Sequence, residues 1–134
     1  MGSNCAQDKA DGSVPNTVDR STCPSGAIYR LTSDTFAGSQ AYNLAKGNIT
    51  IYREGNLTIS NNLTYASTTY NNLNLDTLRD IPNLTIVVKG NVKIASNVTD
   101  LNATIYATGY INTCSTFISD TSPVCTSALN VNGS

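Results

Sequence analysis

The segment GNITIYREGNLTIS at residues 47–60 returns as PNLTIVVKGNVKIA at residues 82–95. The two copies share Asn, Thr, Ile, Gly, Asn and Ile at equivalent positions. A third copy follows more closely, where LNATIY at 101–106 overlays PNLTIV at 82–87. Self-similarity of this kind indicates a chain built from stacked equivalent units.

The first offset, from 47 to 82, exceeds the second, from 82 to 101, by the length of the segment 66–81. We interpret residues 66–81 as an excursion inserted between two repeats. Such an insertion would lengthen one unit without changing the pattern on either side of it. The sequence therefore predicts a regular repeat that is interrupted once.

Short apolar–polar alternations fill each repeat, as in Ile49/Ile51 and Leu57/Ile59, and glycines such as Gly55 separate them. Alternation over a few residues predicts strands, and glycine marks tight corners. Short strands and corners at a near-19-residue period predict an all-β chain forming a short parallel β-helix, or β-solenoid. An antiparallel β-sandwich also fits the alternation and remains the alternative.

In a β-solenoid, equivalent residues of successive coils stack about 4.8 Å apart, the spacing of neighbouring strands. We therefore expect one inward aliphatic column and two polar columns that face outward or occupy corners. The predicted columns are Ile51/Ile86/Ile105, Asn48/Asn83/Asn102 and Thr50/Thr85/Thr104.

Most irregular signals lie in residues 1–46, which contain Asp-Gly-Ser, Val-Pro-Asn and Cys-Pro-Ser-Gly turns. We predict an irregular N-terminal cap with a disulfide over 1–46, and β-solenoid coils with the excursion over 47–134. The length of 134 residues suits one structural domain overall.

The four cysteines fall into two couples, Cys5 with Cys23 and Cys114 with Cys125. Their spacing does not match a zinc site, so disulfides are favoured over four free thiols. Three connectivities exist, and pairing within each couple is preferred because each lies in a polar, turn-rich segment. Two disulfides imply an oxidising compartment, so we expect a secreted or cell-surface protein.

The composition excludes several functions. Asn, Thr and Ser account for 49 residues, charged residues for only 13%, and the net charge is −1. No cationic face is available for nucleic acid or for direct binding to an anionic membrane. Histidine is absent, which removes Ser-His-Asp and Cys-His catalysis and His-ligated metals.

Seven Asn-x-Ser/Thr sequons are potential glycan acceptors in a eukaryotic secreted protein. Six of them coincide with the repeated strand motif, which offers a structural explanation instead. They begin at Asn48, Asn56, Asn62, Asn83, Asn97, Asn102 and Asn132.

The stretch IPNLTIVVKGNVKIASNVTDLNATIYATGYINTC at 81–114, followed by Cys125 and LNVNG at 129–133, resembles a known group of proteins. These are uncharacterised secreted or surface β-solenoid proteins of ultrasmall, host-attached bacteria. The resemblance covers roughly residues 47–133, its motifs are structural, and it implies no activity. Such proteins usually continue after the final glycine, so it implies a longer, membrane-anchored parent.

Candidates for catalysis are few. A polysaccharide-processing β-helix enzyme would need two carboxylates, for which Asp76, Asp80 and Asp100 are candidates, with Arg79 as a possible lyase base. Their spacing is not diagnostic, and solvated turns explain each of them. The run Asp8–Gly12 resembles part of a calcium loop but lacks the alternating ligands and the bidentate Glu. A plain turn explains it better, so we predict no metal and no cofactor.

We therefore expect a non-enzymatic extracellular module of a larger cell-surface protein, serving adhesion or as a stalk. Its partners would be a host-cell glycan or protein, or neighbouring domains of the same chain. Tyr65, Tyr70 and Arg79, in or beside the excursion, are the predicted partner-binding residues, because binding sites often lie on loops of a rigid scaffold. A polysaccharide-processing enzyme and a filament or oligomer subunit are the alternatives.

Overall fold

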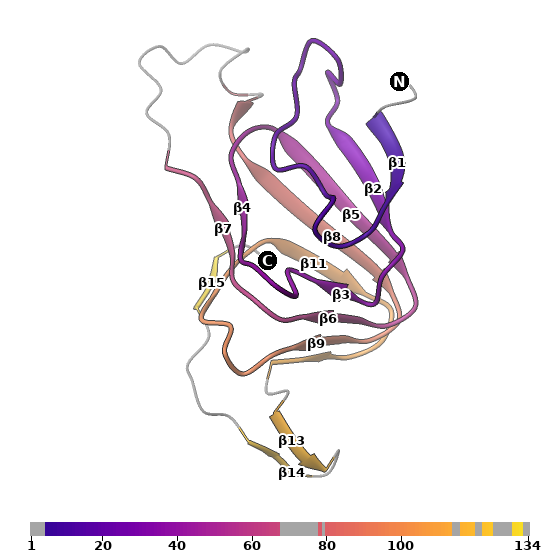
Figure 1. The fold of residues 1–134 in the computed structure, drawn as a ribbon, viewed down its shortest axis with the longest axis vertical. Coiled ribbons are helices and arrows are strands. Elements are labelled where there is room, and N and C mark those ends of the chain that lie inside the picture. The colour runs from indigo at the N-terminus through magenta and orange to yellow at the C-terminus, as the bar shows by residue number, and fades with distance from the viewer. Residues whose placement is uncertain are drawn as a thin grey trace.

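The computed structural model describes residues 5–67, 78, 80–113, 116–119, 122–124 and 130–132. All the elements assigned there are strands (Figure 1), so the prediction of an all-β chain is confirmed. The strands are β1 (Ala6–Lys9), β2 (Ala27–Leu31), β3 (Thr35–Phe36), β4 (Tyr42–Leu44), β5 (Asn48–Glu54), β6 (Leu57–Ile59), β7 (Leu63–Tyr65), β8 (Asn83–Lys89), β9 (Val92–Ile94), β10 (Asp100–Asn102), β11 (Thr104–Ala107), β12 (Ile111–Asn112), β13 (Thr116–Ser119), β14 (Ser122–Val124) and β15 (Asn130–Asn132).

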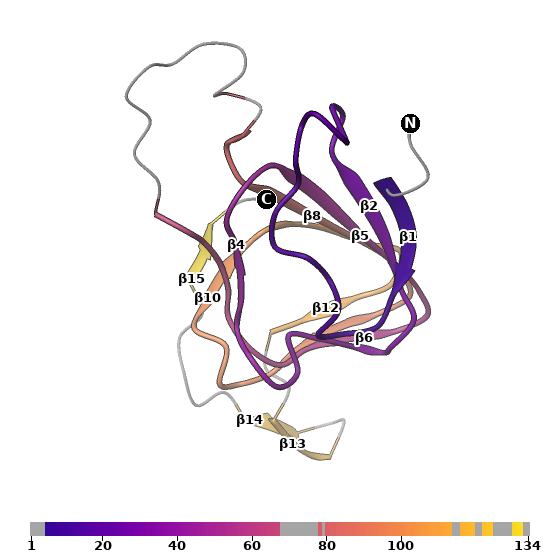
Figure 2. The same ribbon diagram turned by 45° about the horizontal axis from the view of Figure 1, so that its top comes forward.

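Three parallel sheets hold all of these strands except the β13–β14 hairpin. The first sheet has the order β1-β2-β5-β8-β11, the second β12-β9-β6-β3 and the third β15-β10-β7-β4. From β2 to β10 the chain supplies one strand to each sheet in turn, and Figure 2 shows the sheets around a common interior. Since the pairing within these sheets is parallel, the alternative of an antiparallel sandwich is wrong.

The strand register confirms two of the three predicted columns. Ile86 pairs with Ile51 on one side and Ile105 on the other, and the threonine column aligns in the same way. The asparagine column is only partly correct. Asn48 pairs with Asn83, but Asn102 ends β10 and pairs in the third sheet, because the chain already bends at the next residue.

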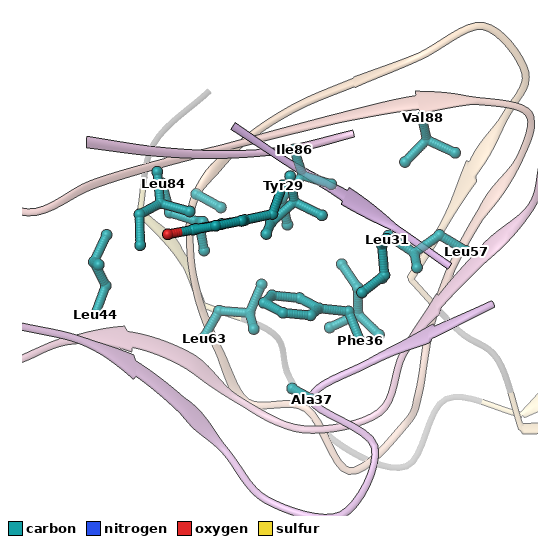
Figure 3. Packing of buried hydrophobic residues seen from close by; sticks show 14 of the residues in the cluster. Tyr29, Leu31, Phe36, Ala37, Leu44, Leu57, Leu63, Leu84, Ile86 and Val88 are labelled. Carbon is teal, nitrogen blue, oxygen red and sulfur yellow. The ribbon is translucent and has the colours of Figure 1, made fainter. Parts of the chain in front are cut away.

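The interior is apolar throughout the described residues, in which no polar or charged residue is buried. Alternation along each strand explains this, since β8 buries Leu84, Ile86 and Val88 and turns the residues between them outward. Figure 3 shows these three side chains directed into the interior, where the rings of Tyr29 and Phe36 also lie. Removing such aliphatic surface from water is the main stabilising contribution to the packing of the sheets.

Strand pairing begins earlier than the predicted boundary after residue 46. Residues 27–44 form β2, β3 and β4, one strand for each sheet, and Ala27 pairs with Ile49 in the five-stranded sheet. The segment AIYRL of β2 alternates in burial as the later strands do. It lacks the Asn-x-Thr-Ile motif, which is why the repeat comparison does not detect it.

The excursion leaves the register intact. Thr85 pairs with Thr50, which precedes the excursion, and with Thr104 in the next repeat. Strand β7 ends at Tyr65 and β8 begins at Asn83. The extra residues therefore lie between two strands that belong to different sheets. Residues 68–77 and 79 lie outside the described part of the chain.

Asparagine side chains connect successive strands at one corner. The Asn56 Oδ1 atom accepts the Asn91 N–H at 2.9 Å, and the Asn91 Oδ1 atom accepts the Tyr110 N–H at 3.1 Å. These amides satisfy backbone donors where the chain turns between sheets. Asn56, Asn91 and Tyr110 each follow a glycine. A Cβ atom on Gly90 would lie 2.8 Å from the carbonyl group of Gly55.

We expect Gly90→Ala to destabilise the protein by about 1–3 kcal/mol, because the added methyl group overpacks against backbone that cannot rotate away. Urea unfolding followed by circular dichroism measures the effect. Lys89→Ala, at the neighbouring exposed position, is the control and should change stability by less than about 0.5 kcal/mol. Equal midpoints for Gly90→Ala and the wild type would contradict the packing at this corner.

The predicted Cys5–Cys23 disulfide is confirmed, with a Cα–Cα distance of 5.6 Å. It links the residue before β1 to the turn that precedes β2, and both cysteines are buried. Cys114 and Cys125 lie outside the described residues, so their pairing stays a prediction.

Peptide mapping without reduction tests both pairings. We expect one disulfide-linked peptide pair that joins Cys5 to Cys23 and another that joins Cys114 to Cys125. A linked pair that joins Cys5 to Cys114 would refute the pairing.

Candidate functional site

Of the three predicted partner-binding residues, the structure describes Tyr65 alone. Tyr65 ends β7 and is half-buried, and its hydroxyl oxygen accepts the Leu84 N–H at 3.0 Å. This bond connects the end of β7 to β8 on the far side of the excursion. Tyr70 and Arg79 lie outside the described residues.

The two candidate carboxylates that the structure describes, Asp80 and Asp100, are held by neighbouring groups. Asp80 pairs with Arg20 at 2.9 Å, Lys46 lies 4.0 Å from the same carboxylate oxygen, and the Asp80 carbonyl accepts the Gly47 N–H. The Asp100 carboxylate accepts the Thr99 hydroxyl at 3.0 Å. Asp76 lies outside the described residues. The Asp80 contacts fasten the end of the excursion to the segment before β2 and to the start of β5.

Several sequon asparagines also make contacts between strands or corners. The Asn62 Oδ1 atom accepts the N–H groups of Thr99 and Asp100, at 2.8 and 3.2 Å. The Asn97 Nδ2 group donates to the Ser60 carbonyl at 2.8 Å. Together with Asn56, these contacts show a structural use for three of the sequons.

A pocket of about 440 Å³ lies between residues 11–16 and residues 36–43. We call it the end pocket, because β3 and β4 beside it are the terminal strands of the second and third sheets. Sequence reasoning missed it, since its two walls lie far apart along the chain and carry no motif. The nearest signal was the turn-rich composition of 11–16.

Asp11 connects the two walls. Its Oδ1 atom accepts the Ala37 N–H and its Oδ2 atom accepts the Gly38 N–H, both at 3.0 Å. Ala37 has a φ angle of 56°, a left-handed conformation that is uncommon for a residue with a side chain. Asp8 and Lys9 are the last residues of β1, and the turn follows at Asp11 and Gly12, where the Asp11 carboxylate holds the strained backbone at Ala37. The prediction of a plain turn over Asp8–Gly12 is therefore only partly correct.

Two further hydrogen bonds join the walls. The Tyr42 hydroxyl donates to the Pro15 carbonyl, and the Asn16 Nδ2 group donates to the Asn43 carbonyl at 3.1 Å. The Tyr42 ring also packs against Phe36, with ring centroids 5.0 Å apart. Both walls of the end pocket are thereby fixed relative to each other.

The Tyr42 phenol should make stability depend on pH. Burial raises the pKa of Tyr42 well above its ordinary value, and the nearby Tyr29 phenol adds to the rise. The folded chain therefore keeps the phenolic proton to higher pH than the unfolded chain. The stabilisation is complete below pH about 10 and is lost as the pH rises beyond that value.

We expect the urea midpoint of the wild type to decrease as the pH is raised above about 10, the ordinary tyrosine pKa, and the urea midpoint of Tyr42→Phe to decrease less. Burial also raises the pKa of Tyr29, so part of the slope should remain. Tyr106→Phe is the control, because Tyr106 is 61% exposed. Identical slopes for Tyr42→Phe and the wild type would contradict this interpretation.

The lining of the end pocket offers groups suited to binding. Its lining contains one carboxylate, that of Asp11, and no lysine or arginine. Within the described residues, no group of three His, Cys, Asp or Glu side chains could hold a metal ion. The remaining groups are amides, hydroxyls and apolar side chains, which suit recognition of a neutral molecule.

We compared the chain with family models, curated proteins and solved structures, and none of them matches it. In the described part of the chain, no helix has the length and hydrophobicity needed to span a membrane.

Proposed function

We propose that the chain is a β-solenoid module of a larger extracellular protein, serving adhesion or as a stalk without enzymatic activity. The observation that carries this proposal is the uninterrupted column from Ile51 through Ile86 to Ile105 across parallel strands. A stack of coils joined by such columns is a stiff, extended body. It can present loops at a distance from its attachment point.

Other observations support an extracellular location. The Cys5–Cys23 disulfide is of a kind that persists in oxidising compartments. Polar but mostly uncharged residues dominate the composition, and the resemblance to secreted or surface proteins of host-attached bacteria implies the same location. The partner site proposed for the module is the excursion, with Tyr65, Tyr70 and Arg79.

Antibodies raised against the chain test the display role on cells that make the parent protein. We expect staining of intact cells and loss of that staining after brief treatment with an external protease. Staining only after permeabilisation would refute the extracellular location. In parallel, incubation with acidic and neutral polysaccharides should release no reducing ends and no unsaturated products; release of either would favour the enzyme alternative.

Alanine scanning tests the proposed partner site. Tyr65→Ala, Tyr70→Ala and Arg79→Ala should each weaken attachment of the purified chain to host cells or to a glycan array. Tyr65→Phe is a useful companion variant, because it removes the hydroxyl that accepts the Leu84 N–H and keeps the ring. Unchanged attachment for all three alanine variants would remove the excursion as the partner site.

A filament or oligomer subunit is the second candidate, favoured by the exposed end of the sheets. Strands β11 and β12 are the last strands of the first two sheets. Tyr110, just before β12, and Ile111, in β12, are 54% and 45% exposed. Terminal strands offer backbone groups for pairing with another chain. Sedimentation at several concentrations distinguishes this candidate, since a monomeric module keeps one sedimentation coefficient.

A further inference from the structure

We propose that the end pocket binds a neutral saccharide. This goes beyond the display role, in which the partner binds at the excursion, because it places a second binding site apart from the excursion. The pocket volume of about 440 Å³ lies in the range of small-molecule sites.

Two kinds of surface line the end pocket. Val14, Pro15 and Tyr42 are partly exposed and provide apolar surface to the end pocket, and the buried Phe36 lies behind them. The exposed residues of the lining carry mostly hydroxyl and amide groups, which both donate and accept hydrogen bonds. They include Ser13, Asn16, Ser39, Gln40 and Asn43. A sugar presents the matching pair of features, C–H groups on one face and hydroxyls around its edge.

Hydrogen bonds within the chain hold the walls of the end pocket in place. Asp11 bonds to the backbone of Ala37 and Gly38, and two further bonds join the walls at Pro15 and Asn43. A site whose walls are already ordered loses little conformational entropy on binding. The left-handed backbone at Ala37 is the kind of strain that is retained at functional positions.

Charge selects a neutral ligand. Asp11 is the only carboxylate of the lining, and each of its oxygens already accepts a main-chain N–H. An anionic ligand would approach this carboxylate without a lysine or arginine in the lining to balance its charge. A calcium ion needs six to eight oxygen ligands, far more than one engaged carboxylate supplies.

An extended peptide fits less well than a sugar. Peptides commonly bind by adding a strand to an exposed sheet edge. The chain beside β4 is already covered, because the Ala45 N–H donates to the Asn16 carbonyl at 2.8 Å and Thr17 bridges to Lys46. The exposed hydroxyl and amide groups of the lining, such as those of Ser39 and Gln40, remain available to a compact polar ligand.

Titration of the ¹⁵N-labelled chain, followed by NMR, tests the proposal. The probes are lactose and N,N′-diacetylchitobiose as neutral sugars, 3′-sialyllactose as an anionic sugar, and tetra-alanine as a neutral peptide. We expect amide shifts confined to residues 11–16 and 36–43 with a neutral sugar. Binding of 3′-sialyllactose should be several-fold weaker, and tetra-alanine should cause no shift.

Substitutions of exposed lining residues test whether the sugar contacts the end pocket itself. The double variant Ser39→Ala/Gln40→Ala should weaken neutral-sugar binding about fivefold or more, since the loss of even one hydrogen bond to a ligand costs about that factor. Ser25→Ala, at an exposed position outside the pocket, should bind as the wild type does. An unchanged spectrum away from the substituted residues shows that both variants are folded.

Three outcomes would overturn the proposal: no shift with either neutral sugar, shifts outside the two walls, or equal binding by the double variant and the wild type. Stronger binding of tetra-alanine than of either sugar would also overturn it, in favour of a peptide site. None of these results affects the display role, which is tested separately by staining of intact cells.

Discussion

Replacing Ile86 with alanine is expected to cost about 2–5 kcal/mol of folding stability, the range for truncation of a buried aliphatic side chain. Ile86 is 0% exposed and lies between Ile51 and Ile105 on the neighbouring strands. Removing its side chain leaves a cavity in the middle of the column. The strands on either side are fixed by their parallel register, so they can close the cavity only partly.

Urea unfolding compares the loss of folding stability in Ile86→Ala with the loss in Thr85→Ala. Thr85 lies next to Ile86 on the same strand and is aligned with its own column, but it is only partly buried. We expect its substitution to cost at most about 1 kcal/mol. Equal losses for the two variants, with unchanged denaturant slopes, would show that the Ile column is not the centre of the packing.

The double variant Cys5→Ser/Cys23→Ser is expected to lose about 2–5 kcal/mol of folding stability. The bridge closes a loop across a sequence separation of 18 residues, for which the chain-entropy model gives roughly 3 kcal/mol. Both cysteines are buried in the apolar cluster, so the serine hydroxyls add a desolvation cost. The segment between them precedes β2 and includes the wall 11–16 of the end pocket.

Denaturant unfolding under non-reducing conditions and limited proteolysis check this expectation together. We expect a lower unfolding midpoint and new cleavage within the segment between the two cysteines, where the bridge no longer restrains the chain. The companion variant Cys5→Ala/Cys23→Ala separates loss of the bridge from burial of a hydroxyl. A wild-type midpoint in both double variants would mean that the disulfide contributes nothing to stability.

The columns could be predicted because parallel pairing brings equivalent positions together. Identical residues of successive repeats lie opposite one another when register is maintained, as Thr50, Thr85 and Thr104 do. The excursion could be located for the same reason, since the register resumes after it. The position of Asn102 could not, because the repeat does not reveal which side of a corner a residue occupies.

Sequence reasoning did not find β2, which pairs with β1 and β5 in the first sheet. Its segment Ala27–Leu31 buries every second residue, but the outward residue Ile28 is itself apolar, so the sequence does not show this alternation clearly. The step along the chain from Ala27 to its partner Ile49 is longer than the step from Ile86 to Ile105, so a search for the repeat does not find it. Parallel pairing requires a matching register of the backbone groups, and it tolerates corners of different length.

Alternation and repetition in the sequence were by themselves sufficient to establish an all-β chain with the columns of Ile86 and Thr85, because each depends on residues at regular local spacing. The end pocket was decided only by tertiary structure. Its walls meet through Asp11, Tyr42 and Asn16, whose partners lie 26 or 27 residues away in the chain. Hydrogen bonds over such separations depend on how the corners orient the chain, and no periodic pattern records that orientation.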